Sequence, residues 1–226
     1  MKLWVKNLIR DASFYSGISS FLLSLSRIYR CPVLLIFVYH KVQPAFSRGE
    51  YLGIPGQIFD RHIRFIKDNF KVISLEDGLD VIYKNNSKNI YAAINFDDGY
   101  MDNYYNAYPV LQKYKIPATI FLTTDIMGVS HTFWWDRLFN LVYSMKTDYM
   151  DIEIDSNRLN FKLSNLKQRT LAASHINSIL INKNDDEIEY FIQNLEKEFQ
   201  IKEKARPTEM LSWHEVKKMN NGLIHF

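Results

Sequence analysis

The chain has 226 residues, of which 47% are hydrophobic and 23% are charged, and its formal net charge is +3. This composition is that of a folded protein with a sizeable core, and it excludes an intrinsically disordered chain. The low charge, without a dense block of lysine and arginine, argues against nucleic-acid binding, and the single cysteine, Cys31, excludes an internal disulfide.

Residues 1–32 are expected to form an amphipathic segment ahead of the main domain, which spans 33–226. Three basic residues precede a partly apolar stretch that serines and a glycine interrupt, and further arginines follow it. A membrane span needs about 18 or more apolar residues with few or no charges. We therefore expect no transmembrane span, at most a weak contact with a membrane surface, and a cytoplasmic location, with the cell envelope as the alternative.

The next part of the chain alternates between two kinds of periodicity. Apolar runs predict four strands: 33–39, 71–73, 90–96 and 118–123. Amphipathic spacing predicts three helices between them: 57–69, Ser74 to about 83, and 103–114, where Pro109 kinks the helix or starts its second half. This order is typical of a parallel α/β sheet, either open or closed into a barrel.

From about residue 130 to 205 the pattern changes, and we interpret it as a mainly helical insertion on the core sheet. The expected elements are a helix, a hairpin that turns at Ser156-Asn157, and two more helices: 133–145, 149–155 with 158–163, 166–181, and 185–199. A capping box from Ser212 to Glu215 then opens another helix. The last residues begin a strand, so we expect the chain to be truncated at its C-terminus.

Three polar residues directly follow predicted strands. His40 follows the first strand, and Asp97 and Asp98 follow the strand 90–96. Ligands of parallel α/β folds bind at the carboxyl ends of the strands, so the three are expected at one edge of the sheet. Gly99 permits a tight turn in which one carboxylate binds a cation while the other takes a proton. A plain surface turn is the alternative, because Asp-Gly is a common turn pair.

The surrounding sequence resembles the polysaccharide deacetylase family, which includes chitin, chitooligosaccharide and peptidoglycan deacetylases and some acetylxylan esterases. NFDDGY and the following KYKIPATIFL resemble the family's Thr-Phe-Asp-Asp-Gly-Tyr motif and its Gly-Ile-Pro-Ala-Thr-Phe-Phe segment, with Asn95 in place of Thr and Lys115 in place of Gly. FVYHKV, FKVISLEDGLDVI, FWWDRL and LSWHEVKKMNNGLIHF extend the resemblance from residue 33 to the end, weakest across 145–205.

The resemblance implies the N-terminal part of a distorted (β/α) barrel and a hydrolase that removes acetyl groups from a polysaccharide or amino sugar. Asp97 would be the general base, and Asp98 would bind a divalent metal, zinc or a similar ion, whose water attacks the acetyl carbonyl. The family's other metal ligands lie in a His-Ser/Thr-x-x-His motif that would follow the last strand. We therefore expect this chain alone to be inactive, since catalytic zinc takes three protein ligands.

His40 is the candidate substrate-binding residue, with a structural hydrogen bond as the alternative. No two of the remaining histidines are spaced as a ligand pair: His62, His131, His175, His214 and His225. Trp134 and Trp135 either stack on a sugar or anchor the insertion. A non-catalytic glycan-binding or interaction protein stays open as an alternative function. A phosphoryl-transfer enzyme is disfavoured, because the sequence lacks the glycine-rich phosphate loop that such an enzyme needs.

Overall fold

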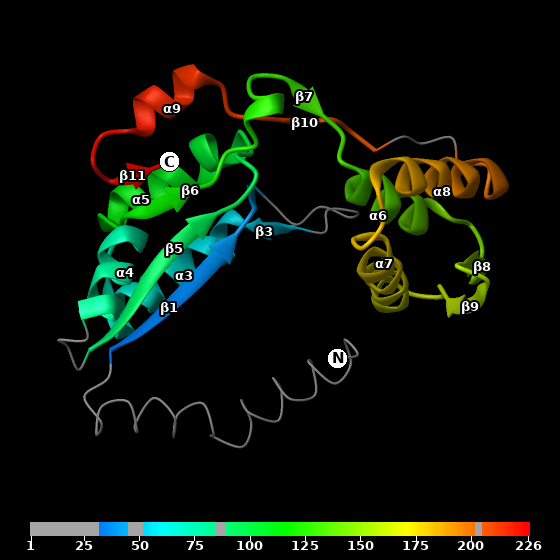
Figure 1. Ribbon diagram of the computed structural model, residues 1–226, viewed down its shortest axis with the longest axis horizontal. Coiled ribbons are helices and arrows are strands. Elements are labelled where there is room, and N and C mark those ends of the chain that lie inside the picture. Colours follow the sequence, from blue (N-terminus) through cyan, green and yellow to red (C-terminus); the bar gives the residue numbers. More distant parts are fainter. Residues whose placement is uncertain (1–31, 45–51, 85–88, 202–204) are drawn as a thin grey trace.

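The computed structural model describes residues 32–44, 52–84, 89–201 and 205–226, so the amphipathic segment predicted for 1–32 lies outside the described residues except for its last one. A core built on a sheet and a mostly helical part lie next to each other along the long axis of the molecule (Figure 1). Among the described residues, no helix is long and apolar enough to cross a membrane.

The core is a five-stranded sheet whose strands all run parallel. Its members are β1 (Val33–Tyr39), β4 (Lys71–Val72), β5 (Ile90–Phe96), β6 (Ala118–Ile120) and β11 (Ile224–His225). β5 is central, because it pairs with β1 along its whole length and with β4 and β6 at its other edge. β11 pairs with β6. The predicted α/β class is confirmed, and the carboxyl ends of β1, β5 and β6 meet at one edge of the sheet.

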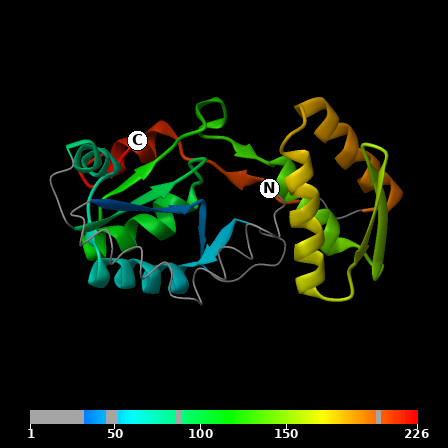
Figure 2. The same ribbon diagram turned by 60° about the horizontal axis from the view of Figure 1, so that its bottom comes forward.

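Helices cover both faces of this sheet. They are α3 (Gly56–Asn69), α4 (Leu75–Lys84), α5 (Tyr108–Tyr114) and α9 (Trp213–Met219). α3 lies on one face and α4 on the other (Figure 2). On the α3 face, Phe59 and Ile63 belong to the same buried cluster as Ile94 and Phe96 of β5. α3 and α4 confirm the amphipathic spacing read from the sequence, with boundaries that differ by one residue.

The predicted helix 103–114 consists of two segments. A π-helix spans Asn103–Ala107, and α5 follows it with Pro109 in its first turn. Proline is tolerated there because the first N–H groups of a helix have no partner within the helix. The expectation that Pro109 starts a second half is confirmed, whereas the π-turn has no separate signal in the spacing of apolar residues.

Among the described strands, β1 lies at an edge of the sheet, and it is only partly buried although its apolar run is typical of a buried strand. Its side chains alternate: Phe37 and Tyr39 pack towards α3, with Tyr39 and Phe59 ring centroids 5.1 Å apart. Ile36 and Val38 point to the other face and stay 47% and 51% exposed. Because both faces of the strand carry apolar residues, the sequence conceals an alternation that a polar outer face would have revealed.

The helical lobe, residues 133–201, has a hydrophobic cluster of its own. Its elements are α6 (Trp134–Ser144), β8 (Tyr149–Ile154), β9 (Asn157–Lys162), α7 (Leu166–Leu180) and α8 (Asp185–Glu198). Buried residues from all three helices and from β8 share this cluster, including Leu138, Ile152, Ile176 and Ile192. The elements predicted for 133–199 are therefore present in the expected order.

Several predicted strand boundaries differ from the observed ones by one to three residues. β6 ends at Ile120 rather than at residue 123, and residues 121–123 lead without regular structure into a short 3-10 helix, Thr124–Ile126. In the β8–β9 hairpin the turn is Asp155-Ser156, one residue earlier than Ser156-Asn157. Both turn residues have a positive φ, 51° and 60°, as a two-residue turn matched to strand twist requires. Asn157 instead pairs with Ile154 as the first residue of β9.

Short strands join the lobe to the core. β7 (Ser130–His131) and β10 (Thr208–Glu209) form an antiparallel pair at the two ends of the lobe. β2 (Lys41–Gln43) and β3 (Gly53–Pro55) form a small parallel pair beyond the end of β1. The chain thus leaves the core and returns to it at nearly the same place.

The predicted capping box of α9 is formed. The Ser212 hydroxyl accepts a hydrogen bond from the His214 amide at 3.1 Å, and the Glu215 carboxylate accepts one from the Ser212 amide at 3.1 Å. The hydrogen bonds from Ser212 hold the pKa of Glu215 below its ordinary value. The cap fixes the start of the helix that leads into β11.

Ser212→Ala is expected to lower the free energy of unfolding by about 0.5–2 kcal/mol, measured by urea denaturation at pH 7. A carboxyl whose pKa is lowered by folding stabilises above its unfolded pKa, and the effect disappears as the pH falls through the folded pKa. The difference from wild type should therefore shrink in acid. Ser178→Ala is the control, since that hydroxyl donates to a carbonyl of its own helix. Equal losses for the two variants would contradict the capping role.

Candidate active site

The structure brings two of the three predicted site residues into contact distance at the carboxyl ends of β1 and β5. The Asp97 amide donates to the Tyr39 carbonyl at 3.0 Å, which continues the ladder between the strands past their ends. His40 Nε2 then lies 3.8 Å from Asp97 Oδ2, with the side chains 30% and 40% exposed. A partly exposed carboxylate next to an imidazole can accept a proton from a bound water.

The turn after β5 gives the two neighbouring aspartates different backbone conformations. Asp98 and Gly99 both have a positive φ, 71° and 76°. A non-glycine residue in this conformation costs about 1–3 kcal/mol and persists only where the surroundings hold it. They do so here, because the Leu211 amide donates to the Gly99 carbonyl at 2.8 Å, and a Cβ on Gly99 would lie 2.8 Å from Leu122. The predicted need for glycine at this turn is confirmed.

The Asp98 carboxyl has a perturbed pKa. Burial raises the pKa of Asp98 above its ordinary value, and the neighbouring Asp97 carboxylate adds to the rise. His40, the Tyr100 hydroxyl and Lys41 act in the opposite direction. A half-buried carboxylate beside a cavity is well placed to interact with a cation or a donor on a ligand.

A buried ion pair that sequence reasoning missed lies under this turn. Lys41 Nζ donates to both carboxylate oxygens of Asp136, at 3.2 and 3.1 Å, and to the Thr208 hydroxyl at 3.2 Å. The side chains of Lys41 and Asp136 are only 3% and 9% exposed. A partial signal was available, because Lys41 stands in the largely apolar segment FVYHKV. A lysine that is buried in such a segment needs a partner, although the sequence does not show which residue supplies it.

Tyr100 connects the turn to the aromatic residues of the lobe. Its side chain is fully buried, Lys41 Nζ lies 4.6 Å from its ring centroid, and its ring meets Phe133 edge-on at 5.6 Å. Burial raises the pKa of Tyr100 strongly, and the Asp98 and Asp136 carboxylates add to the rise, so the hydroxyl keeps its proton. The Tyr100 hydroxyl lies close enough to Asp98 and Trp135 to interact with both. Among the described residues, however, neither this hydroxyl nor Trp135 Nε1 makes a hydrogen bond of good geometry.

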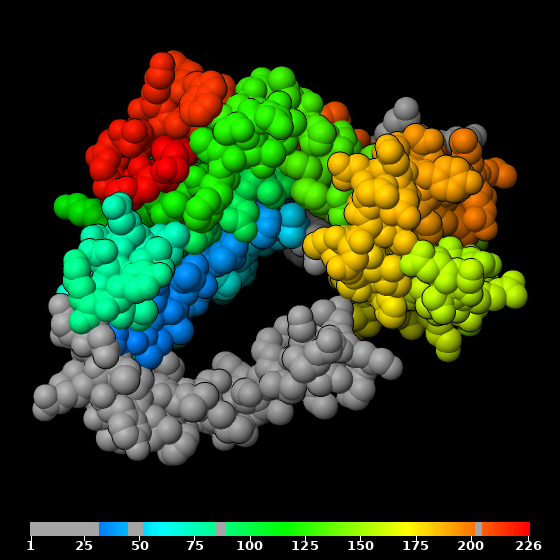
Figure 3. All heavy atoms as spheres, viewed as in Figure 1, coloured from blue at the N-terminus to red at the C-terminus, as the bar shows by residue number. Residues whose placement is uncertain are grey.

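A cavity of about 470 Å³ opens beside Asp98. It lies within the size range of small-molecule sites, about 300–1,000 Å³. The residues that line it come from the strand ends and from the helical lobe: His40, Leu52, Asp98, Trp134, Trp135, Asn177, Ile181, Lys183, Asp185 and Ile188. Figure 3 shows the surface notched between core and lobe. The contribution of the lobe was not predicted, apart from the possible stacking role of Trp134 and Trp135.

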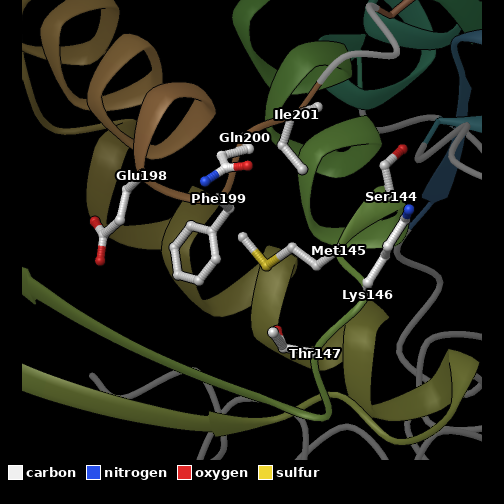
Figure 4. A pocket seen from close by; sticks show the side chains of 8 residues that line it. All are labelled: Ser144, Met145, Lys146, Thr147, Glu198, Phe199, Gln200 and Ile201. Atoms are coloured by element: carbon white, nitrogen blue, oxygen red, sulfur yellow. The ribbon is translucent and has the colours of Figure 1, made fainter.

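A second cavity, of about 560 Å³, lies entirely within the lobe, between the ends of α6 and α8 (Figure 4). Met145, Phe199 and Ile201 supply its apolar lining. It contains neither of the strand-end aspartates nor His40. Its size alone therefore does not make it the candidate site.

The other histidines lie outside the cavity beside Asp98. His62 Nδ1 is 3.5 Å from the Tyr39 hydroxyl, and the ring of His131 packs against Phe133 at 4.6 Å. His175 and His214 are exposed on helices.

A metal site does not assemble from the described residues alone. Within residues 32–44, 52–84, 89–201 and 205–226, no three His, Cys, Asp or Glu side chains gather closely enough to hold a metal ion. A catalytic zinc takes three protein ligands, so this part of the chain does not fit one by itself. Asp98 could contribute one ligand.

Comparison with known proteins identifies one family and two relatives that are named as deacetylases. The family described as polysaccharide deacetylase matches residues 84–198. YxkH of Bacillus subtilis (strain 168), named for the same family, is 36% identical over 100 residues, which are 43% of this chain and 34% of that protein. The poly-β-1,6-N-acetyl-D-glucosamine N-deacetylase of Staphylococcus aureus (strain MSSA476) is 28% identical over 190 residues, 81% of this chain and 63% of that protein. The chain thus spans less than two thirds of either relative.

Solved structures are also similar. The structure of IcaB from Ammonifex degensii aligns with a TM-score of 0.47 at 16% identity, over 85% of this chain and 50% of that one. The Streptococcus pyogenes deacetylase PplD in complex with acetate aligns with a TM-score of 0.37 at 28% identity, over 42% and 43% of the two chains.

Proposed function

This chain belongs to the polysaccharide deacetylase family, and from that membership we propose that its protein hydrolyses acetyl groups from an N-acetylated amino-sugar polymer. The observation that carries the proposal is the pair formed by Asp97 and His40 at the strand ends, next to a cavity that Asp98 and His40 line. The sugar is suggested by the Staphylococcus aureus relative, whose name specifies N-acetyl-D-glucosamine.

In the proposed reaction, Asp97 acts as the general base. Its carboxylate takes a proton from the water that attacks the acetyl carbonyl carbon, and the bond between that carbon and the sugar nitrogen then breaks. The products are acetate and a free amine, and the proton returns to the amine nitrogen. His40, 3.8 Å from Asp97, orients the carboxylate and contacts the sugar.

The proposal includes a divalent metal, zinc or a similar ion, with Asp98 as one ligand. The two aspartates differ in backbone conformation, and of the two only Asp98 lines the cavity, so different tasks are assigned to their carboxylates. Because the described residues do not complete a metal site, the proton transfer described above is assigned to Asp97 alone.

The test is acetate release. The full-length protein that contains this chain is incubated with the tetrasaccharide of N-acetylglucosamine and, separately, with an O-acetylated xylan oligosaccharide. Free acetate is measured enzymatically. We expect release from the first substrate and little from the second. EDTA should abolish the release and added zinc should restore it.

The other outcomes distinguish the alternatives. Release from the O-acetylated substrate only would make the protein an esterase. Saturable binding of the tetrasaccharide without acetate, with zinc present, would contradict hydrolysis and support a glycan-binding protein.

A further inference from the structure

The cavity beside Asp98 has two walls of different origin. His40 and Asp98 supply one wall, from the ends of β1 and β5, and the helical lobe supplies the other. On the lobe side, Trp134 begins α6, Asn177 lies in the last turn of α7, and Asp185 begins α8. Three separate helices of the lobe therefore converge on the cavity that Asp98 and His40 line on the core side.

Two polar side chains on the lobe wall have no partner. Among the described residues, the Asn177 amide and the Asp185 carboxylate take part in no hydrogen bond or ion pair, although both line the cavity. Lys183, between them in the sequence, is different, because its Nζ lies 2.6 Å from Asp155 Oδ1. Asn177 and Asp185 are thus available to a ligand without breaking an existing contact.

The aromatic part of the wall is held in place. Trp135 stacks on Phe133 with ring centroids 4.4 Å apart and an angle of 12° between the planes, and Trp134 meets Trp135 nearly perpendicularly at 5.4 Å. Rigid indole faces next to free amide and carboxylate groups suit a sugar, which offers an apolar ring face and a rim of hydroxyl groups.

The charges in the cavity select among sugars. Of the charged side chains that line it, Asp98 and Asp185 are carboxylates, while the positive Lys183 is already paired with Asp155. A neutral or amine-bearing glycan is compatible with this balance. A chain of uronic acids or phosphorylated sugars would meet like charges at short range.

We propose that the helical lobe forms a sugar-binding subsite for the unit next to the one that is deacetylated, with Asn177 and Asp185 as its hydrogen-bonding residues. This inference rests on the proposed function, because the location of the reacting unit depends on Asp97 and Asp98. It assigns the enzyme an oligomeric, neutral or amine-bearing substrate rather than a single sugar.

Alanine substitution tests the subsite. The double variant Asn177→Ala/Asp185→Ala is compared with Asn194→Ala/Asp186→Ala, whose exposed residues lie in α8 outside the cavity. Asp186 and Asp185 both lie in the first turn of α8, so both doubles remove one charge from that helix end. The Kd of the N-acetylglucosamine tetrasaccharide is measured by calorimetry. Because Asn177→Ala/Asp185→Ala loses two hydrogen bonds to the sugar, its Kd should rise about tenfold or more. The Kd of the control variant should stay unchanged.

The readouts separate this inference from the proposed function. In Asn177→Ala/Asp185→Ala, KM for acetate release from the tetrasaccharide should also rise, whereas KM for the monosaccharide should stay unchanged. Equal Kd values for both doubles and wild type, or no binding by wild type, would overturn the subsite. If wild type releases acetate in that case, the proposed function stands. Tetrasaccharide binding that depends on Asn177 and Asp185, without acetate release, would retain the subsite and overturn the deacetylase.

Discussion

Asp136→Ala is expected to lower the free energy of unfolding by about 3–5 kcal/mol, the largest effect of any single change considered for this chain. The Lys41 ammonium is 3% exposed, and Asp136 supplies its only carboxylate among the described residues, at 3.1 Å. Removing that carboxylate leaves a buried positive charge without an ion-pair partner, next to the Tyr100 ring and the Thr208 hydroxyl. Most of the expected loss in stability comes from the unpaired Lys41 ammonium in the protein interior rather than from the lost attraction between Lys41 and Asp136.

Equilibrium unfolding in urea, followed by both circular dichroism and tryptophan fluorescence, measures this effect. Glu189→Ala is the control, since it removes a 46% exposed partner of Arg137 and should cost at most about 1 kcal/mol. Lys41→Met/Asp136→Leu removes both charges and should recover most of the lost stability. A loss below about 1 kcal/mol for Asp136→Ala would show that water reaches Lys41.

Asp97→Asn is expected to lower kcat for acetate release by about 10²–10⁴-fold, because an amide cannot take the proton from the attacking water. The substitution keeps the size of a side chain that is 40% exposed, so the melting temperature should change little. Both quantities are measured on the same preparation, with the N-acetylglucosamine tetrasaccharide as substrate.

Asp125→Asn is the matched control, because Asp125 is an exposed aspartate in the 3-10 helix that follows β6. Its kcat should stay within about twofold of wild type, as expected for a surface change away from the site. A similar kcat for Asp97→Asn would place the base elsewhere. His40 and Asp98, which line the cavity, would then be the groups to test next.

Much of the fold could be predicted because its signals are local. The apolar run that forms β5, the capping box at Ser212 and the proline at the start of α5 each act within a few residues, and each is formed as expected. The edge position of β1 could not be predicted. It depends on which strands pair with it, and an apolar strand looks the same at an edge and in the centre.

The same division holds for the candidate site. The topology of a parallel sheet was enough to bring His40 next to Asp97, because both follow strands that pair directly. The lobe wall was not predictable, since Asn177 and Asp185 reach the cavity only through the packing of α7 and α8. The partner of Lys41 is 95 residues away in the sequence, too far for any periodicity to reveal.

The β7–β10 pair brings the two ends of the helical lobe side by side, which is the geometry of a module that recombination could exchange or delete. Lys41 and Asp136 oppose such an exchange. Lys41 belongs to the core and Asp136 to the lobe, just inside the junction. Any lobe grafted here must bring its own carboxylate to the same place, or arrive together with an apolar residue at position 41. We expect core and lobe to have been inherited as one unit.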